Sequence, residues 1–210
     1  MKIVLFIISI LFLSCNANRN NYDQYNSEKI IFDIILNDIF QKNDNVKIFI
    51  NHNYSFYTNR EISAEESERI KYFYRLTYKK EIAPPKDEDE IIKNYLEVEN
   101  IDGELIKAFI NNRKNNKMIT ISIDTRFQFI DDKSEIKDKL FADQDTNKYL
   151  LIEISNICFN ENRDKAILHI FVEYGTIPFS FVYTRSEYII FEKLEDWKEI
   201  KRTNAWEGIS

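Results

Sequence analysis

The sequence predicts an α+β domain, in which helices from the N-terminal half cover one face of a mainly antiparallel sheet formed by the C-terminal half. Two observations lead to this prediction. Apolar residues recur mostly at helical spacing before residue 118 and at alternating spacing after it. The later segments are also separated by short polar turns, which is typical of an antiparallel meander. We expect a signal peptide over residues 1–14, a polar tether over 15–26 and a single domain over 27–210.

The domain is expected to begin with one helix and one strand. Ser27 is a candidate N-cap, and the apolar residues after it recur at helical spacing, so a helix is expected over residues 28–42. Val46, Ile48 and Ile50 occupy alternate positions of residues 46–50, which predicts a strand.

Three further helices are expected before residue 118. Ser63 precedes a glutamate-rich first turn, the acidic run 87–90 starts a second helix, and Gly103 precedes a third apolar segment at helical spacing. Carboxylates at the start of a helix interact favourably with its positive end. The acidic run 87–90 is therefore interpreted as a helix start rather than as a cation site.

The remaining segments predict a sheet with one short helix. Strands are expected over residues 118–123, 149–159, 165–174, 178–193 and 197–203, and a helix over 134–141. Within 165–174, one face is apolar, while the other combines Ile167, His169, Phe171 and Glu173. The segment 178–193 is long for a single strand and is expected to bend near Arg185.

The N-terminus indicates export. Lys2 is followed by a run over residues 3–13 that is apolar except for Ser9, and Ser14 and Cys15 come next. A helix needs about 20 apolar residues to cross a bilayer, so this run is too short for a stable anchor and fits a signal peptide. We therefore expect a cell-envelope location, on the periplasmic or the surface side.

Two processing routes fit this segment. Phe12-Leu13-Ser14-Cys15 resembles the lipobox of bacterial lipoproteins, which implies cleavage before Cys15 and lipidation of its thiol, with palmitate among the acyl chains. Each buried methylene contributes about 0.8 kcal/mol, so several acyl chains hold a protein at a membrane. The alternative is cleavage after Ala17 at a loose A-x-A-like site.

Charge and composition exclude some partners. The formal net charge of the chain is −6. It becomes −7 once residues 1–14 are removed, because Lys2 is the one charged residue among them. An acidic domain is repelled by phosphate backbones, so we expect no nucleic-acid partner. With 16 Phe and 12 Tyr, the chain can bury a sizeable core.

No catalytic, cofactor or metal site is predicted. Cys158 lies in an apolar segment, and the two histidines, His52 and His169, are far apart in sequence. Residues 143–147 match the start of a calcium loop, but Lys148 and Ile154 occupy the positions of its glycine and its bidentate glutamate. The acidic residues Asp124, Asp131 and Asp132 form no recognisable acid–base constellation.

Aromatic residues are the remaining candidates for an interaction surface. They fall in two groups, Tyr54, Phe56 and Tyr57 in the first and Tyr72, Phe73 and Tyr74 in the second. Such residues usually belong to the core, whereas an exposed cluster would mark a binding surface. Trp197 is expected to plug the sheet, and Trp206 to pack the tail down.

One set of segments in the C-terminal half has a recognisable order, namely 154–160, 165–168, Tyr188 to Lys193, 197–200 and Trp206, with 105–114 as the preceding helix. In these segments the chain is similar to uncharacterised bacterial lipoproteins. It implies an envelope location and a fold, and no reaction.

We therefore expect an envelope-tethered lipoprotein that binds a protein or a small ligand and is not an enzyme. One specific form is an immunity-type inhibitor, because an acidic inhibitor steers a basic toxin by charge. The alternative is a hydrolase of the envelope that uses carboxylates with a metal. Converging carboxylates would favour the hydrolase, and an exposed aromatic patch would favour the binding protein.

Overall fold

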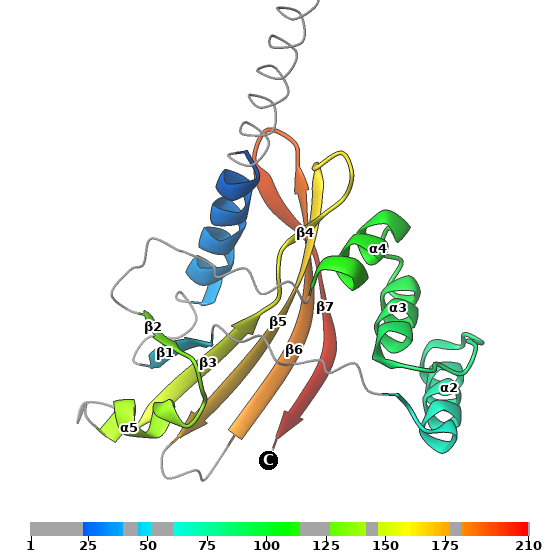
Figure 1. The fold of residues 1–210 in the computed structure, drawn as a ribbon, viewed down its shortest axis with the longest axis horizontal. Coiled ribbons are helices and arrows are strands. Elements are labelled where there is room, and N and C mark those ends of the chain that lie inside the picture. Colours follow the sequence, from blue (N-terminus) through cyan, green and yellow to red (C-terminus); the bar gives the residue numbers. More distant parts are fainter. Residues whose placement is uncertain are drawn as a thin grey trace, which may run out of the picture. The chain divides into compact units, whose positions relative to one another are not determined.

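The computed structural model describes residues 23–39, 46–51, 61–113, 127–141, 147–176 and 182–209 (Figure 1). The chain divides into two compact units, residues 1–44 and 45–210. The division lies inside the predicted domain 27–210. The signal peptide, Cys15 and most of the tether lie outside the described residues.

The described part of the first unit is a helix over residues 23–39. It begins earlier than predicted, so Ser27 lies inside the helix and is not its N-cap, and residues 23–26 are helical rather than part of a tether. The side-chain amide of Gln24 donates to Glu28 at 2.7 Å, a pair one helical turn apart. Such pairs stabilise a helix, which extends this one beyond the point where the apolar pattern starts.

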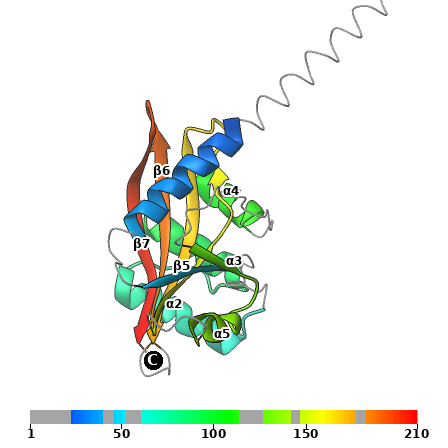
Figure 2. The same cartoon turned by 90° about the vertical axis from the view of Figure 1, so that its left-hand side faces the viewer.

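The second unit contains a mixed sheet of seven strands (Figures 1 and 2). The strands are β1 Lys47–Asn51, β2 Phe127–Ile130, β3 Lys148–Ile154, β4 Cys158–Phe159, β5 Lys165–Thr176, β6 Val182–Lys193 and β7 Trp197–Ile209. Their order is β2-β1-β3-β5-β6-β7, and β4 pairs with β5. The pairs from β3 onward are antiparallel, whereas β1 is parallel to β2 and to β3. The predicted α+β class is confirmed; the predicted strand over 118–123 lies outside the described residues.

Two details of the sheet differ from the prediction. The expected strand 149–159 is interrupted after Ile154, where the Ser155 backbone N–H still donates to His169 O at 2.9 Å. The irregularity expected near Arg185 occurs in the β6–β7 pairing. Its register skips Ala205 and, further along, Ile200, so both extra residues belong to β7 and not to β6. The edge strand β7 therefore carries two bulges.

Four helices accompany the sheet, namely α2 Ala64–Tyr78, α3 Glu88–Val98, α4 Gly103–Asn112 and α5 Glu135–Phe141. The first three begin at side-chain caps. Ser63 accepts from the Glu66 N–H, Asp87 from the Glu90 N–H and Asp102 from the Glu104 N–H. The capping residue predicted for α2 is confirmed, and the acidic run at 87–90 forms a helix start as predicted.

The helices α3, α4 and α5 pack on one face of the sheet, which we call the helix-covered face. One core cluster joins α3 and α4 to β5 and β6 through Leu96, Phe109, Ile167 and Tyr188. A second cluster joins Ile136 and Leu140 of α5 to Phe49, Ile130, Tyr149 and Leu151. Directly opposed strand residues share a face, so the register places Tyr149, Leu151 and Glu153 on this face with Gly175, Glu173 and Phe171.

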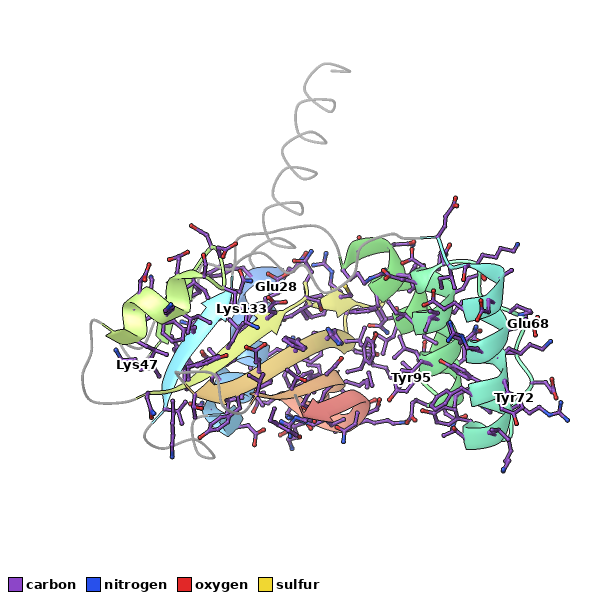
Figure 3. The ribbon with its side chains drawn as sticks, turned by 90° about the horizontal axis from the view of Figure 1, so that it is seen from below. Glu28, Lys47, Glu68, Tyr72, Tyr95 and Lys133 are labelled. Atoms are coloured by element: carbon purple, nitrogen blue, oxygen red, sulfur yellow. The ribbon has the colours of Figure 1, made fainter. Side chains whose placement is uncertain are left out.

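The helix α2 lies outside α3, on the far side from the sheet (Figures 1 and 3). Its inner side contributes Tyr74 to the core, and the Tyr74 hydroxyl donates to Ile91 O of α3 at 3.3 Å. The Ser67 hydroxyl donates to Pro85 O at 2.7 Å, which ties α2 to the extended segment before α3. This leaves the outer side of α2 as a surface of the second unit.

Candidate functional site

The outer side of α2 carries three large apolar side chains in solvent. Tyr72 is 61% exposed, Phe73 is 53% exposed and Leu76 is 51% exposed. We call these three residues the α2 patch. Figure 3 shows Tyr72, with Glu68 one turn earlier, on the side of α2 away from the sheet. Leu76 is four positions from Tyr72 and three from Phe73, and side chains at these two spacings are neighbours on a helix surface, so the patch is continuous through Leu76.

Only part of the patch could be expected from the sequence. Tyr72, Phe73 and Tyr74 are consecutive aromatic residues, and the structure separates them, because Tyr74 is 4% exposed and points into the core. Phe73 remains in contact with the inner aromatics, with its ring centroid 6.1 Å from that of Tyr74 in an edge-to-face arrangement. Leu76 belongs to the apolar residues that recur at helical spacing in this segment, but its side chain is exposed to solvent. The patch is therefore anchored by Phe73 and extended outward by its neighbours.

Charged residues surround the patch in two groups. Toward the helix N-terminus lie Glu65 and Glu68, and toward its C-terminus lie Arg75 and Lys79. The side chains of Glu65, Glu68 and Arg75 are 84%, 64% and 67% exposed. Arg69, whose side chain is 74% exposed, also lies toward the helix N-terminus, so the outer side of α2 carries both signs of charge around the apolar residues, with its glutamates confined to the N-terminal half.

A histidine–serine pair lies in the interior of the helix-covered face. His169 Nε2 and Ser186 Oγ are 2.5 Å apart, and both residues are fully buried. Burial lowers the pKa of His169 to about 3, and the nearby Arg113 guanidinium adds to this effect, so the imidazole is neutral. Its ring packs against that of Tyr188, with centroids 4.8 Å apart. A serine beside a histidine is the basis of many nucleophilic sites, but a substrate cannot reach this pair, and we interpret it as a hydrogen-bonded core contact.

Two buried glutamates, Glu153 of β3 and Glu173 of β5, lie on neighbouring strands and on the same face of the sheet. The Glu173 carboxylate accepts from the Tyr149 hydroxyl at 2.7 Å and pairs with the Lys133 ammonium at 2.5 Å. Glu153 accepts from the Asn51 side-chain amide at 2.8 Å. Figure 3 shows Lys133 above β1 and β3. Each carboxylate is therefore occupied by a donor from the protein itself.

The environment of Glu153 and Tyr149 favours their uncharged forms. Burial raises the pKa of the Glu153 carboxyl, as does the neighbouring Glu173 carboxylate, while the Asn51 amide and Lys133 oppose the rise. Burial also raises the pKa of the Tyr149 hydroxyl, and its contact with Glu173 adds to the effect. A single acidic residue inside each otherwise apolar strand was the one signal in the sequence that could have indicated this cluster.

The remaining candidate residues have structural roles. The Cys158 thiol is buried and lies 3.6 Å from Asn156 O, as expected for an inert core cysteine. Asp131 and Asp132 are exposed at the start of α5. The pKa of Asp132 is lowered by hydrogen bonds from the side chain and the backbone of Ser134. Trp197 is buried with its ring edge-to-face on Phe159, which confirms that it plugs the sheet.

Several candidate residues lie outside the described part of the chain. They are Cys15, His52, Tyr54, Phe56, Tyr57, Asp124 and residues 143–146 of the calcium-like segment. The side chain of Trp206 is also not described. The roles predicted for these residues stay predictions.

Among the residues that the structure describes, no three His, Cys, Asp or Glu side chains converge as the ligands of a metal ion. No helix within the described ranges is long and apolar enough to cross a membrane.

Comparison with known proteins found no matching family model, no matching curated protein and no matching solved structure. The resemblance to bacterial lipoproteins accordingly stays a prediction from the sequence. The candidate site must be judged on its own geometry, and the α2 patch is the surface feature that this geometry favours.

Proposed function

We propose that this chain is an exported, lipid-anchored protein of the cell envelope that acts by binding another protein through the α2 patch. The anchor is Cys15, which follows a signal-like apolar run and a small residue, Ser14. The acyl chains on its thiol hold the chain at the membrane, and the folded region presents α2 to the partner.

The observation that carries this proposal is the exposure of Tyr72, Phe73 and Leu76 on one outer helix. Scattered apolar residues on a surface need no explanation, but these three are contiguous and two of them are aromatic. Aromatic residues are enriched in protein interfaces, where they supply a large contact area at a small cost in side-chain entropy. An exposed aromatic patch is the feature that favours a binding protein over a hydrolase.

The buried carboxylates lend the hydrolase alternative no comparable support. Glu153 and Glu173 are 8% and 4% exposed, and they are engaged by Asn51, Tyr149 and Lys133. A general acid or base must reach its substrate within hydrogen-bonding distance. We therefore put forward no second function.

The test of the anchor uses Cys15→Ser. Cells that express the full chain are labelled with radioactive palmitate, and their membranes are separated from soluble material. We expect label in the wild-type chain, none in Cys15→Ser, and loss of the variant from membranes. A wild-type chain without label, or an unlabelled variant that stays in the membrane, would show that the lipid anchor is wrong.

The test of the binding surface compares the full wild-type chain with Tyr72→Ser/Leu76→Ser. Cells expressing each chain are treated with a cross-linker, and the protein joined to the chain is identified by mass spectrometry. We expect one partner with the wild type and at least a tenfold loss with the double variant. The matched control is Leu194→Ser, which alters a residue that is 75% exposed outside α2. A partner retained equally by all three chains would contradict the role of the patch.

A further inference from the structure

We propose that the partner of the α2 patch is a second copy of this chain, docked with its α2 antiparallel to the first and with the two Tyr72 side chains at the centre. The inference rests on the proposed function, because it names the protein that the patch binds. It is argued from the position of Tyr72 within α2 and from the order of charges along the outer side of that helix.

Tyr72 lies next to the middle of α2, which runs from Ala64 to Tyr78. A two-fold axis beside this residue reverses the helix and places most of its length in contact with α2 of a second copy. Tyr78, the last residue of α2, lies about 9 Å from Tyr72 along the helix, so the pairing of the two helices extends about 9 Å to either side of the axis. Closed two-fold contacts of this kind are the commonest form of homo-oligomer.

The charges on the outer side of α2 match in this arrangement. Each helical residue turns by about 100° and rises by about 1.5 Å. Around the helix, Glu68 and Arg75 therefore lie to the same side of Tyr72, by about 40° and about 60°. Along the helix axis, Glu68 lies about 6 Å before Tyr72 and Arg75 about 5 Å after it. The two-fold axis therefore brings Glu68 of one copy to the level of the second copy's Arg75. Glu65, about 11 Å from the centre, lies near the level of the C-terminal end of the second copy's α2, where Lys79 is the C-cap residue.

The opposite side of the patch is also complementary. Arg69 lies about 60° to the other side of Tyr72, at the level of the second copy's Leu76. The aliphatic stem of an arginine covers apolar surface while its guanidinium stays in water, so this contact buries Leu76 without burying a charge. Glu68, Arg75, Arg69 and Leu76 thus each face a group of the second copy that suits them.

A basic partner fits the same surface less well. The chain is acidic as a whole, but the patch is bordered by Arg69, Arg75 and Lys79 as well as by glutamates. A uniformly basic protein would meet these three cations, and like charges placed across an interface oppose binding. A suitable partner instead places a cation opposite each glutamate of α2 and a carboxylate opposite Arg75. The outer side of α2 itself, turned end to end, meets this requirement.

The contacts that compete with formation of the pair are exposed to solvent. The Lys79 Nζ donates to Leu76 O at 2.9 Å. Glu65 and Arg69 are 3.9 Å apart, Glu68 and Lys71 are 3.5 Å apart, and Arg75 and Glu81 are 3.4 Å apart. These are solvent-exposed pairs on one chain, and such pairs contribute little to stability. Their side chains are free to turn toward a second copy.

The interface is small, because a single pair of helices buries less area than a typical stable dimer. Affinity in solution will therefore be modest. Copies tethered to one membrane meet at a high effective concentration, which favours a weak contact without any new interaction. The experiment should accordingly be done on the full, lipid-bearing chain in its membrane.

Cross-linking through the two-fold axis tests the geometry. In the variant Tyr72→Cys the new thiols of two copies face each other across the axis. The loss of the ring weakens the contact, but a short bis-maleimide added to membranes traps each encounter irreversibly, so a covalent dimer should accumulate with time. The wild type supplies the background, which should be low, because the Cys15 thiol carries lipid under the proposed function and Cys158 is buried. Leu194→Cys is the matched control, since Leu194 is 75% exposed outside α2, and it should give no dimer above background.

A charge swap tests the register. Glu68→Arg and Arg75→Glu are each introduced beside Tyr72→Cys, and each should lower the yield of cross-linked dimer about fivefold, because each places like charges opposite one another at two symmetric points. The combination of both changes should restore the yield. Lys93→Glu, on the exposed side of α3, is the control and should have no effect.

Failure of this inference is distinguishable from failure of the proposed function. If folded Tyr72→Cys gives no dimer while Tyr72→Ser/Leu76→Ser releases a different protein, the second copy is wrong and the proposed function holds. If the dimer forms but the swap does not restore it, the antiparallel register is wrong. If neither a second copy nor another protein is bound through α2, both proposals are wrong.

Discussion

The outer side of α2 and the interior of the helix-covered face use the same kinds of residue in opposite surroundings. Tyr72, Phe73 and Glu68 face water on α2, whereas Tyr188, His169 and Glu173 are buried beneath α3, α4 and α5. The buried groups have partners that complete their hydrogen bonds and fix their positions. The exposed aromatic residues contribute little to the fold. Burial therefore separates the residues that stabilise this protein from those available to bind another one.

The largest expected effect comes from the buried side of this comparison. Tyr188→Ala removes a ring that packs against Tyr95, Phe109 and His169. We expect it to lower the free energy of unfolding by about 3–5 kcal/mol, as for other large-to-small changes of aromatic core residues. Urea denaturation followed by circular dichroism measures the change. A loss below about 1 kcal/mol would contradict the assignment of Tyr188 to the core.

Gly175→Ala should follow in size. A Cβ atom at this position would lie 2.6 Å from three atoms of the Tyr149 side chain, whose hydroxyl is held by Glu173 at 2.7 Å. The ring cannot move without losing that contact, so we expect a loss of about 1–3 kcal/mol from overpacking. Thermal denaturation measures it. Combination with Tyr149→Leu, which also removes the hydroxyl, should recover part of the loss; an equal loss in both backgrounds would argue against the clash.

His169 should make the protein sensitive to mild acid. Its pKa in the fold is lowered to about 3, from a usual value near 6.5, so the unfolded chain binds a proton first as the pH falls. Stability from this residue is complete above pH 6.5 and is lost as the pH falls from about 6.5 to 3, and about 2 kcal/mol should be lost by pH 5.

The matched variant for this prediction is His169→Gln, which does not titrate. Urea denaturation of both chains at pH 7 and pH 5 isolates the contribution of the histidine from that of the carboxylates. The difference in stability between the two chains should shrink at pH 5. A constant difference would show that His169 titrates normally in the fold.

Glu153→Gln should stabilise the protein at neutral pH. The pKa of Glu153 is raised in the fold, so its contribution is most favourable at low pH and declines as the pH rises through that value. Glutamine keeps an acceptor for the Asn51 amide and removes the buried charge. We expect a gain of about 1 kcal/mol at pH 8 and a smaller gain at pH 4, measured by urea denaturation. A loss at pH 8 would show that the carboxylate is stabilising.

The smallest effect on stability should come from the α2 patch. Tyr72→Ser alters a side chain that is 61% exposed, so the free energy of unfolding should change by less than about 0.5 kcal/mol. Binding to the partner should nevertheless fall, as measured by cross-linking in membranes. A large loss of stability with unchanged binding would reverse the comparison between the two regions.

Local signals in the sequence were sufficient for most of the elements. Ser63 and the acidic run at 87–90 mark the starts of α2 and α3, because helix caps and first-turn charges act within a few residues. The faces of β5 were also predictable, since alternation in a strand assigns each residue to one side. The start of the first helix was missed, because Gln24 and Glu28 extend it by a polar contact that leaves no apolar pattern.

Contacts between distant segments could not be predicted in the same way. Asn51 and Glu153 are in contact because β1 pairs in parallel with β3. The residues of each strand alone do not indicate whether the two strands pair in parallel or antiparallel. The same limit applies to Tyr72 and Tyr74, two residues of one type on one helix. Tyr74 is buried and Tyr72 is exposed because α3 packs on the side of α2 that carries Tyr74. The position of α3 is set by tertiary packing rather than by the local sequence.

The two bulges of β7 have a consequence for chains held together at a membrane. A straight strand at the border of a sheet exposes unpaired backbone groups, which can recruit the same strand from a neighbour and extend the sheet from molecule to molecule. At Ile200 and Ala205 the backbone of β7 departs from regular pairing, and lysines at 198 and 201 add like charge along it. Crowding would thus favour a closed pair of copies over an open-ended fibre.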